Sequence, residues 1–223
     1  MNTLILGSGF GLYGYLPAAY KLSNKIYLQE HYKKKFLSRY ELSKFESKIV
    51  WFKNLDNILN YLKIIIIARR PSDQFNTLNK ILKKRNNITH FFLEKPIAPN
   101  PRQSLMLINM LKKNRKKYNF GFIFKYLAWY KLIKKKISNK NRNIFFFHWK
   151  IKNNKKNKLT SWKYANIKGG GIVRYYGIHF IKLFSDLNFF EIKYNKILKD
   201  YWEILILDKR QNTIRLIIEY SKV

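Results

Sequence analysis

The chain has no cysteine and no long apolar run, and each absence excludes a class of protein. Without cysteine there is neither a disulfide framework nor a thiolate metal site. The four histidines, His31, His90, His148 and His179, show no metal-ligand spacing, so we expect no metal. The longest aliphatic run, residues 64–68, is far shorter than the roughly 20 residues that a membrane span needs.

A secretory signal is also missing from the start of the sequence. The chain enters an apolar strand almost at once, with no charged segment before it and no small-residue cleavage site after it. Together with the short apolar runs, this predicts a soluble, cytoplasmic protein without a membrane span.

Acidic residues are scarce: there are 12 of them against 46 lysines and arginines, which gives a net charge of +34 at pH 7. A charge of this size is typical of proteins that bind nucleic acid or an anionic membrane. The chain is also rich in Asn, Ile, Phe and Tyr, which share A/T-rich codons with Lys, so a biased base composition would produce the same excess. Because the lysines are dispersed along the whole chain, the sequence favours a solvated basic surface, and a polyanion partner remains the alternative.

The first half of the chain alternates between short apolar strands and amphipathic helices, which is typical of a doubly wound α/β sheet. The run of four isoleucines at residues 64–67 predicts a central parallel strand that is covered on both faces. The predicted strands are residues 3–7, 26–28, 48–52, 64–67 and 91–93, and the predicted helices are residues 12–22, 55–62, 74–84 and 104–113.

The pattern changes after Asn119, where strands begin to dominate. This predicts a dinucleotide-binding domain at residues 1–119 and a short α+β domain at residues 120–223 with a mostly antiparallel sheet. The second domain is predicted to have strands at residues 120–124, 144–151, 203–207 and 213–220, one helix at residues 178–187, and a basic, mobile loop at residues 153–158.

A glycine-rich turn, Gly7-Ser8-Gly9-Phe10-Gly11, lies between the first strand and the first helix. Glycines at such a turn let the backbone approach a pyrophosphate at the positive end of the helix. Glu30 follows the second strand, where an acidic residue accepts hydrogen bonds from a ribose hydroxyl. The residues predicted to bind a dinucleotide here are Gly7, Gly9, Phe10, Gly11 and Glu30. The alternative is a glycine-rich turn without a ligand.

Two later segments carry further candidates. Glu94-Lys95-Pro96 ends an apolar strand at the edge of the sheet where ligands bind, and a lysine there can have a lowered pKa that suits proton transfer. A surface ion pair is the alternative. The second segment contains three consecutive glycines, which give the backbone freedom close to a ligand, followed by Tyr175 and His179. The imidazole of His179 is expected to point at the same cleft, and a packed or surface histidine is the alternative.

These motifs occur in the order found in the Gfo/Idh/MocA family, which the chain resembles. The resemblance rests on the glycine turn, the Ile-Ala-x-x-Pro sequence that ends at Pro71, Glu94-Lys95-Pro96 and the Gly-Gly-Gly…Gly-x-His segment. It implies a Rossmann domain, a second domain whose sheet often mediates oligomerisation, and an oxidoreductase that uses NAD or NADP on a sugar, cyclitol or nucleotide sugar.

The resemblance also implies roles for single residues. Lys95 and His179 are the candidate catalytic residues, with Tyr175 beside them. Pro71, Glu94 and Lys95 are expected to contact the cofactor. Substrate contacts are expected from the second domain, with Lys125, Trp162 and Lys163 as candidates.

The chain departs from the family's pattern at several of these positions. Tyr175 replaces an aspartate, Lys182 replaces an acidic residue, and Gln74 replaces a histidine. Arg69 and Arg70 stand where small residues are usual, and they would either bind phosphate groups or crowd the site. The chain is also shorter than most members, so its second domain is expected to be truncated. These departures leave a second hypothesis, a non-catalytic member that binds cofactor and acts as a sensor or binds a partner protein.

Overall fold

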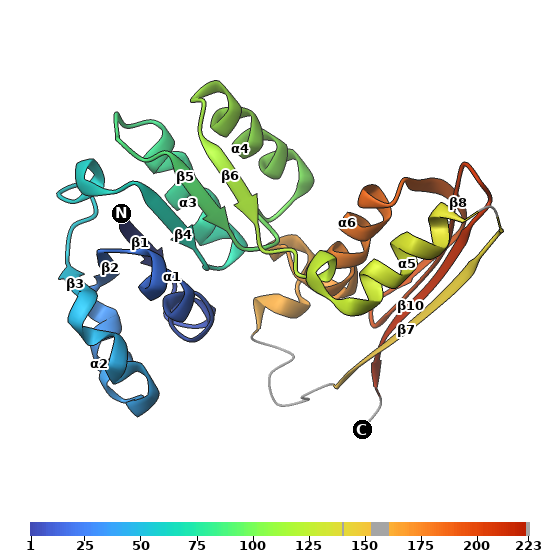
Figure 1. Cartoon of the computed structure of the whole chain (residues 1–223), viewed down its shortest axis with the longest axis horizontal. Helices are drawn as coiled ribbons and strands as arrows, with labels where there is room; N and C mark the ends of the chain where they lie inside the picture. The colour runs from blue at the N-terminus through green and yellow to red at the C-terminus, as the bar shows by residue number, and fades with distance from the viewer. Residues whose placement is uncertain (140, 153–160, 222–223) are drawn as a thin grey trace. The chain divides into compact units, whose positions relative to one another are not determined.

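A computed structural model describes residues 1–139, 141–152 and 161–221; the predicted basic loop at residues 153–158 lies outside them. The chain divides into two compact units, Met1–Gly121 and Phe122–Val223 (Figure 1). In the described ranges no helix has the length and apolar character needed to cross a bilayer.

The first unit contains a six-stranded sheet in the order β3-β2-β1-β4-β5-β6, and all neighbouring strands are parallel. This order confirms the predicted Rossmann fold. From β1 the strand order runs outwards to β2 and β3 on one side, and from β4 to β5 and β6 on the other. The carboxyl ends of β1 and β4 therefore form the switch point where ligands bind in such sheets. The strands are β1 (Asn2–Leu6), β2 (Lys25–Gln29), β3 (Ile49–Phe52), β4 (Ile64–Ile67), β5 (His90–Leu93) and β6 (Lys117–Phe120).

Helices cover both faces of this sheet, because alternate side chains of its central strands point to opposite sides. Leu4 and Leu6 pack with α3 and α4 in one core cluster, whereas Ile5 packs with α1 and α2 in another. The isoleucines of β4 divide in the same way, as predicted for a strand buried on both faces. The helices are the π-helical turn η1 (Gly11–Tyr15), α1 (Leu16–Leu22), α2 (Lys33–Leu37), α3 (Pro71–Leu82) and α4 (Pro101–Lys113).

Two predicted elements are wrong, one from each predicted domain. The helix expected at residues 55–62 is only a short 3-10 turn, Leu59–Tyr61. Ile58, Leu59 and Leu62 are buried at helical spacing, but the N–H groups of Ile58, Tyr61 and Leu62 bond to carbonyls three residues earlier, which is the 3-10 pattern. The strand expected at residues 120–124 does not form either. Phe120 ends β6, where it pairs with Leu93 in the first sheet, and the chain then leaves the sheet.

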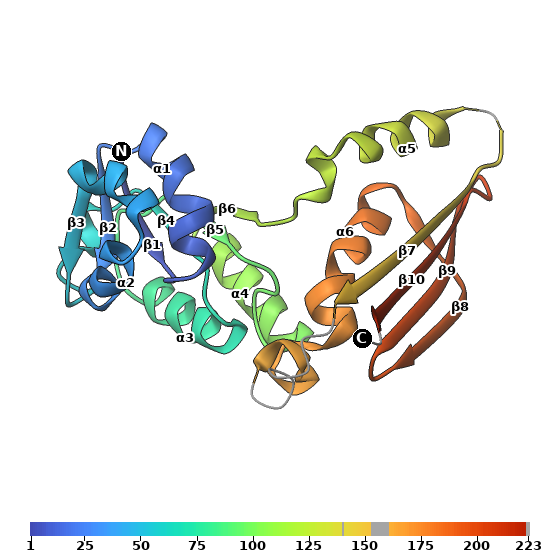
Figure 2. The same ribbon diagram turned by 90° about the horizontal axis from the view of Figure 1, so that it is seen from below.

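The second unit contains a four-stranded sheet in the order β7-β10-β9-β8. The β10–β7 pair is parallel and the other two pairs are antiparallel, so the expected mostly antiparallel sheet is confirmed. Two helices, α5 and α6, cover one of its faces (Figure 2). The elements are α5 (Ala128–Ser138), β7 (Ile144–Lys152), α6 (Ile178–Asp186), β8 (Phe189–Leu198), β9 (Tyr201–Asp208) and β10 (Thr213–Ser221).

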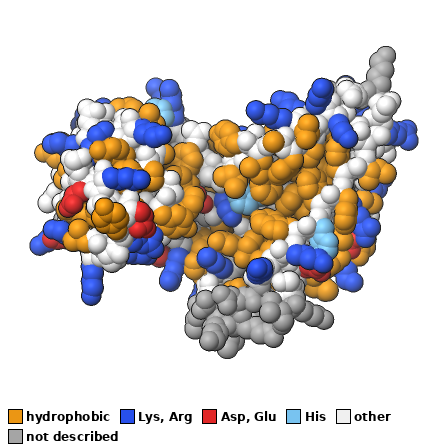
Figure 3. All heavy atoms as spheres, turned by 60° about the horizontal axis from the view of Figure 1, so that its bottom comes forward, with side chains coloured by type: hydrophobic (Ala, Val, Ile, Leu, Met, Phe, Trp, Pro, Cys, Tyr) orange, Lys and Arg blue, Asp and Glu red, His pale blue; other side chains and the backbone are white. Residues whose placement is uncertain are grey.

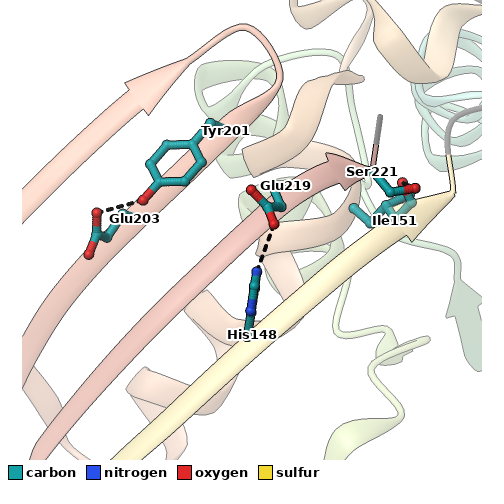
Figure 4. Close-up of polar contacts among 6 residues, drawn as sticks. All are labelled: His148, Ile151, Tyr201, Glu203, Glu219 and Ser221. Atoms are coloured by element: carbon teal, nitrogen blue, oxygen red, sulfur yellow. Dashed lines mark hydrogen bonds and ion pairs between the residues drawn. The ribbon is translucent and has the colours of Figure 1, made fainter. Parts of the chain in front are cut away.

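The other face of this sheet carries polar pairs. Ile214, Leu216 and Ile218 of β10 are fully buried against the helices, so the alternate residues of this strand, 215, 217 and 219, point outwards. Glu219 accepts a hydrogen bond from His148 Nε2 of β7 at 2.9 Å, and on β9 the Tyr201 hydroxyl donates to Glu203 at 2.6 Å (Figure 4). This carboxylate raises the pKa of Tyr201 to about 12.

Candidate functional site

The glycine turn joins the carboxyl end of β1 to η1 at the switch point. Gly7 has a φ of +132°, and a Cβ atom there would lie 2.2 Å from the backbone oxygen of Ala68, so only glycine permits this approach between β1 and β4. A Cβ atom on Gly11 would lie 3.1 Å from Cγ2 of Ile5. At Gly9, by contrast, a Cβ atom would meet no heavy atom within 4 Å. The turn is therefore closed towards the sheet and open beside Gly9.

The open side of the turn fits a dinucleotide pyrophosphate. η1 begins at Gly11 and continues into α1, so the positive end of the helix dipole lies at the turn. The backbone N–H groups of Gly9 and Phe10 donate to no acceptor within the described residues. Such N–H groups at a helix start bind phosphate oxygens. Gly7, Gly9, Phe10 and Gly11 thus lie together, in an arrangement that suits the predicted ligand.

Glu94 directly follows β5, and Tyr15 of η1 holds its carboxyl group. The Tyr15 hydroxyl donates to Glu94 Oε1, and the Lys95 backbone N–H donates to Oε2 at 3.3 Å. A Cβ atom at Gly121 would lie 2.5 Å from this carboxylate, so a glycine there leaves room for the pair. The contact joins the glycine-turn helix to the Glu-Lys-Pro segment. Sequence reasoning missed this contact, because the two residues lie 79 positions apart in the chain.

Burial sets the electrostatics of this pair. It raises the pKa of Glu94 above its usual range, although the hydrogen bond from Tyr15 and the charge of Lys95 act to lower it. Burial also raises the pKa of Tyr15, and the neighbouring carboxylate adds to the effect. The phenol therefore remains the proton donor of the pair at neutral pH.

The backbone around Lys95 is held by Gln74 of α3. Gln74 is fully buried, and its Nε2 donates to the carbonyl oxygens of Glu94 at 2.7 Å, Ile97 at 3.1 Å and Pro96 at 3.4 Å. The Lys95–Pro96 peptide bond is cis. Lys95 itself is half-buried. The side-chain amide that replaces the family's histidine thus stabilises the segment that presents Lys95. Pro71, also predicted to contact cofactor, is the buried first residue of the same helix.

The predicted ribose ligand, Glu30, directly follows β2. It opens a short 3-10 helix after β2, and its carboxylate pairs with Lys53 Nζ at 3.6 Å with both side chains largely exposed. The residue before it, Gln29, is the last of β2, and its Oε1 accepts a hydrogen bond from Tyr32 at 2.8 Å. The Tyr32 hydroxyl in turn accepts from the Gly7 N–H at 3.0 Å. Gln29 and Tyr32, which sequence reasoning missed, are therefore the β2-end residues linked to the turn.

In the second unit the three glycines shape the turn before η9 (Ile172–Gly177). Gly169 and Gly171 both have a φ of +82°. A Cβ atom on Gly170 would lie 2.0 Å from the backbone oxygen of Trp162, so that position requires glycine for its close approach. The three glycines thus let the backbone lie directly against residues 162–166 before the chain enters η9 and α6.

This close approach brings together three of the predicted residues. The ring of Tyr175 lies 5.3 Å from that of Trp162 in an edge-on arrangement, and Lys163 Nζ lies 5.4 Å from the centre of the Tyr175 ring. The ring of Tyr176 also packs against Tyr175, with the two ring centres 4.7 Å apart. Burial raises the pKa of Tyr176 to about 12.

His179 lies in the first turn of α6 and is buried at 7% exposure. Its ring stacks on Phe124 at 4.9 Å. His179 and Lys125 line the same small hollow of about 10 Å³, which Lys182 and Asp186 also line. The Lys182 ammonium forms an ion pair with Asp186, so the charge at this departure from the family pattern is balanced within the unit.

No group of His, Asp or Glu side chains in the described ranges could hold a metal ion. The predicted residues thus form separate sets within the two units. Around the glycine turn and β5 lie the cofactor candidates and Lys95. In the second unit Tyr175 lies with Trp162 and Lys163, while His179 lies with Lys125.

Comparison with solved structures supports the fold over almost the whole chain. An NAD-binding protein from Listeria innocua matches with a TM-score of 0.76 and 14% identity, covering 99% of this chain and 67% of that chain. The WlbA (WbpB) dehydrogenase from Thermus thermophilus, solved with NAD and UDP-GlcNAcA, matches with a TM-score of 0.72 and 12% identity, covering 98% of this chain and 73% of that chain.

A third similar structure is a super-repressor mutant of Gal80p from Saccharomyces cerevisiae. Its TM-score is 0.72 at 13% identity, with 100% of this chain and 68% of that chain covered. A comparison with curated protein sequences gives no match. The sequence profile of the oxidoreductase family with an NAD-binding Rossmann fold, Gfo/Idh/MocA, matches residues 1–122. The chain therefore belongs to the Gfo/Idh/MocA family.

Proposed function

We propose that this chain is an NAD(P)-dependent oxidoreductase that acts on a hydroxyl or keto group of a sugar, cyclitol or nucleotide sugar. The observation that carries the proposal is the glycine turn at the switch point of a family-matched Rossmann sheet, closed at Gly7 and open at Gly9. The bound cofactor would supply hydride transfer. The backbone of residues 9–11 would hold its pyrophosphate.

Three side chains are proposed to manage the substrate and its proton. Lys95 would bind the reacting oxygen, because Gln74 and Tyr15 hold its segment rigidly. His179 would transfer the proton, with Tyr175 as a hydrogen-bond donor. Lys125, Trp162 and Lys163 would bind the substrate. A nucleotide sugar suits these lysines, and the Thermus thermophilus relative was solved with such a ligand.

The test is a fluorescence titration of the purified chain with NADH and NADPH at two salt concentrations. Saturable binding that survives high salt in the wild type and is lost in Gly9→Asp supports the proposal, because the new carboxylate would occupy the open space where a phosphate would bind. Asn57→Asp is the matched control, since it adds the same charge at an exposed position. Binding that disappears with salt, or that is equal in Gly9→Asp and wild type, would show only an anion on a basic surface and would overturn the proposal.

A second candidate function is non-catalytic: a cofactor-binding sensor or partner-binding protein. It is favoured by the replacement of an aspartate by Tyr175, which packs against Trp162 and Tyr176, and by the structural likeness to Gal80p. Saturable cofactor binding without hydride transfer on any sugar, cyclitol or nucleotide sugar tested would favour this reading. Turnover that is lost in His179→Gln would reject it.

Two partners are also at issue. For homo-oligomers we propose the helix-free face of the second sheet, where Ile144 and Phe146 are 81% and 58% exposed. Phe146→Lys would then reduce the molar mass measured by light scattering, whereas an unchanged mass would contradict this interface. A nucleic-acid partner is not proposed, because the lysines are dispersed along the whole sequence. On the one face drawn in Figure 3, Lys and Arg side chains lie scattered among hydrophobic ones.

A further inference from the structure

The carboxyl ends of β1, β2 and β4 are tied together by the hydroxyl of Tyr32. This hydroxyl accepts the Gly7 N–H of the β1 turn at 3.0 Å, donates to Gln29 Oε1 at the end of β2 at 2.8 Å, and accepts from Arg69 Nη2 at 3.3 Å. Tyr32 is 5% exposed, so this hydrogen-bonded junction is part of the core beside the glycine turn. Arg69, two residues beyond β4, thus reaches across the switch point.

The Arg69 guanidinium has a defined position in this junction. Nη2 also donates to Gln29 Oε1, and Nη1 donates to the Thr77 hydroxyl of α3 at 3.1 Å. A guanidinium carries five N–H donors, and these three acceptors leave part of that set for a ligand. Its charge is not neutralised within the junction, because Gln29, Tyr32 and Thr77 are all neutral. The structure therefore holds a fixed, uncompensated cation next to the end of β2.

The end of β2 is also where dinucleotide sites distinguish the two nicotinamide cofactors. An acidic residue there accepts hydrogen bonds from the free 2′-hydroxyl of NAD, whereas a nearby arginine accommodates the 2′-phosphate of NADP. Here the last residue of β2 is Gln29, whose Oε1 is already occupied by Tyr32 and Arg69, so its amide N–H groups are what it can offer a ligand. The acidic Glu30 pairs with Lys53 instead.

We propose that Arg69 binds the 2′-phosphate of NADP(H), and that the chain consequently prefers NADPH to NADH. The inference rests on the proposed dinucleotide site and specifies its ligand. Gln29 and Tyr32 act as positioning residues, since they orient the guanidinium. The exposed lysines that follow Tyr32, at positions 33–35, add to the positive potential around the guanidinium. The opposing charges nearest in sequence are Glu30, beside Gln29, and Asp73, in the first turn of α3.

The test compares dissociation constants for NADPH and NADH in the wild type and in Arg69→Gln at high salt. Loss of charge-assisted hydrogen bonds to a phosphate predicts about 10- to 100-fold weaker NADPH binding, with NADH binding changed by less than about twofold. Arg70→Gln is the matched control: it removes the same charge at the neighbouring, exposed N-cap of α3, which has no bond to the Tyr32 junction, so the preference should persist. Competition by adenosine 2′,5′-bisphosphate, compared with 5′-AMP, tests the same contact without nicotinamide.

The outcomes separate this inference from the proposed function. Equal affinities for both cofactors that are lost in Gly9→Asp would keep the dinucleotide site and overturn the role of Arg69. Equal effects of Arg69→Gln and Arg70→Gln would overturn it too, since charge alone would then explain the preference. Failure to bind either cofactor would reject both proposals. If Arg69→Gln does not fold, Gln29→Glu replaces it: the new carboxylate neutralises Arg69 and repels phosphate, so it should weaken NADPH binding about 10-fold and spare NADH.

Discussion

Replacing Gln74 by leucine tests whether a buried side-chain amide holds the segment around Lys95. Gln74 is fully buried, and its Nε2 serves three backbone carbonyls, two of them at 2.7 and 3.1 Å and the third at 3.4 Å. Leucine has nearly the same volume but no donor. The substitution therefore removes the hydrogen bonds with little change in packing, and it leaves carbonyl groups buried without their partner.

The expected loss can be worked out from these contacts. The two shorter bonds contribute about 1 kcal/mol each, and carbonyls left unpaired in the core add about 1–3 kcal/mol to the cost. Leucine also removes Gln74 Oε1, a buried acceptor without a donor in the described part of the chain. Removing this unpaired group stabilises the variant by about 1 kcal/mol and offsets part of the loss. The net destabilisation is therefore about 2–4 kcal/mol.

The assay is urea unfolding followed by circular dichroism, with Asn76→Leu as the matched control. Asn76 lies on the same helix, is exposed, and loses the same amide, so its substitution should change the free energy of unfolding by less than about 0.5 kcal/mol. Gln74→Leu should also weaken cofactor binding, because Lys95 loses its support. Equal free energies of unfolding for the two variants would refute the reasoning.

Three further predictions concern single groups. Because burial raises the pKa of Glu94, its folded form binds a proton more tightly than the unfolded chain does, so its contribution to stability is present below pH 4.5 and falls as pH rises through the raised value. Glu94→Gln keeps an acceptor for Tyr15 and removes this decline; a difference in unfolding free energy that stays flat with pH would contradict it. Gly7→Ala should destabilise by about 3 kcal/mol or more in chemical denaturation, because of its φ of +132° and the close backbone oxygen, whereas Gly9→Ala should be nearly neutral. Gly177→Ala places a Cβ atom 2.4 Å from a buried indole ring of β9 and should cost about 1–3 kcal/mol; an unchanged thermal midpoint and tryptophan emission would show that this ring can move freely.

Much of the first unit could be predicted from sequence because its signals are local. A run of four β-branched isoleucines favours a strand buried on both faces, and the glycine turn carries its own backbone requirements at Gly7. The β8 strand was missed for the opposite reason. Most of its side chains are exposed and its register shifts at two places, so it has no clean alternation of polar and apolar residues. Helix α5 was missed as well, because lysines alternate with its apolar residues and only Ile133 among its side chains is buried.

The site was harder to predict where contacts join distant segments. Glu94 belongs to a recognised motif, but nothing in that motif indicates that its carboxylate accepts a hydrogen bond from Tyr15, 79 residues earlier in the chain. At the end of β2 the same difficulty holds. Gln29 and Tyr32 are linked to Gly7 by hydrogen bonds that no sequence motif indicates.

The parallel pairing of β7 with β10 has a consequence for the order of folding. β7 is an edge strand whose neighbour in the sheet is β10, and Ile144 pairs with Thr213. Strands β8, β9 and β10 follow one another directly and form a meander through local contacts, whereas β7 must wait for the last of them. During synthesis β7 therefore leaves the ribosome long before its partner, and its aromatic residues remain without a sheet to join. Closure of this pair is the late, long-range step in assembly of the second unit, and a chain released before β10 would present an unpaired aromatic strand to other chains.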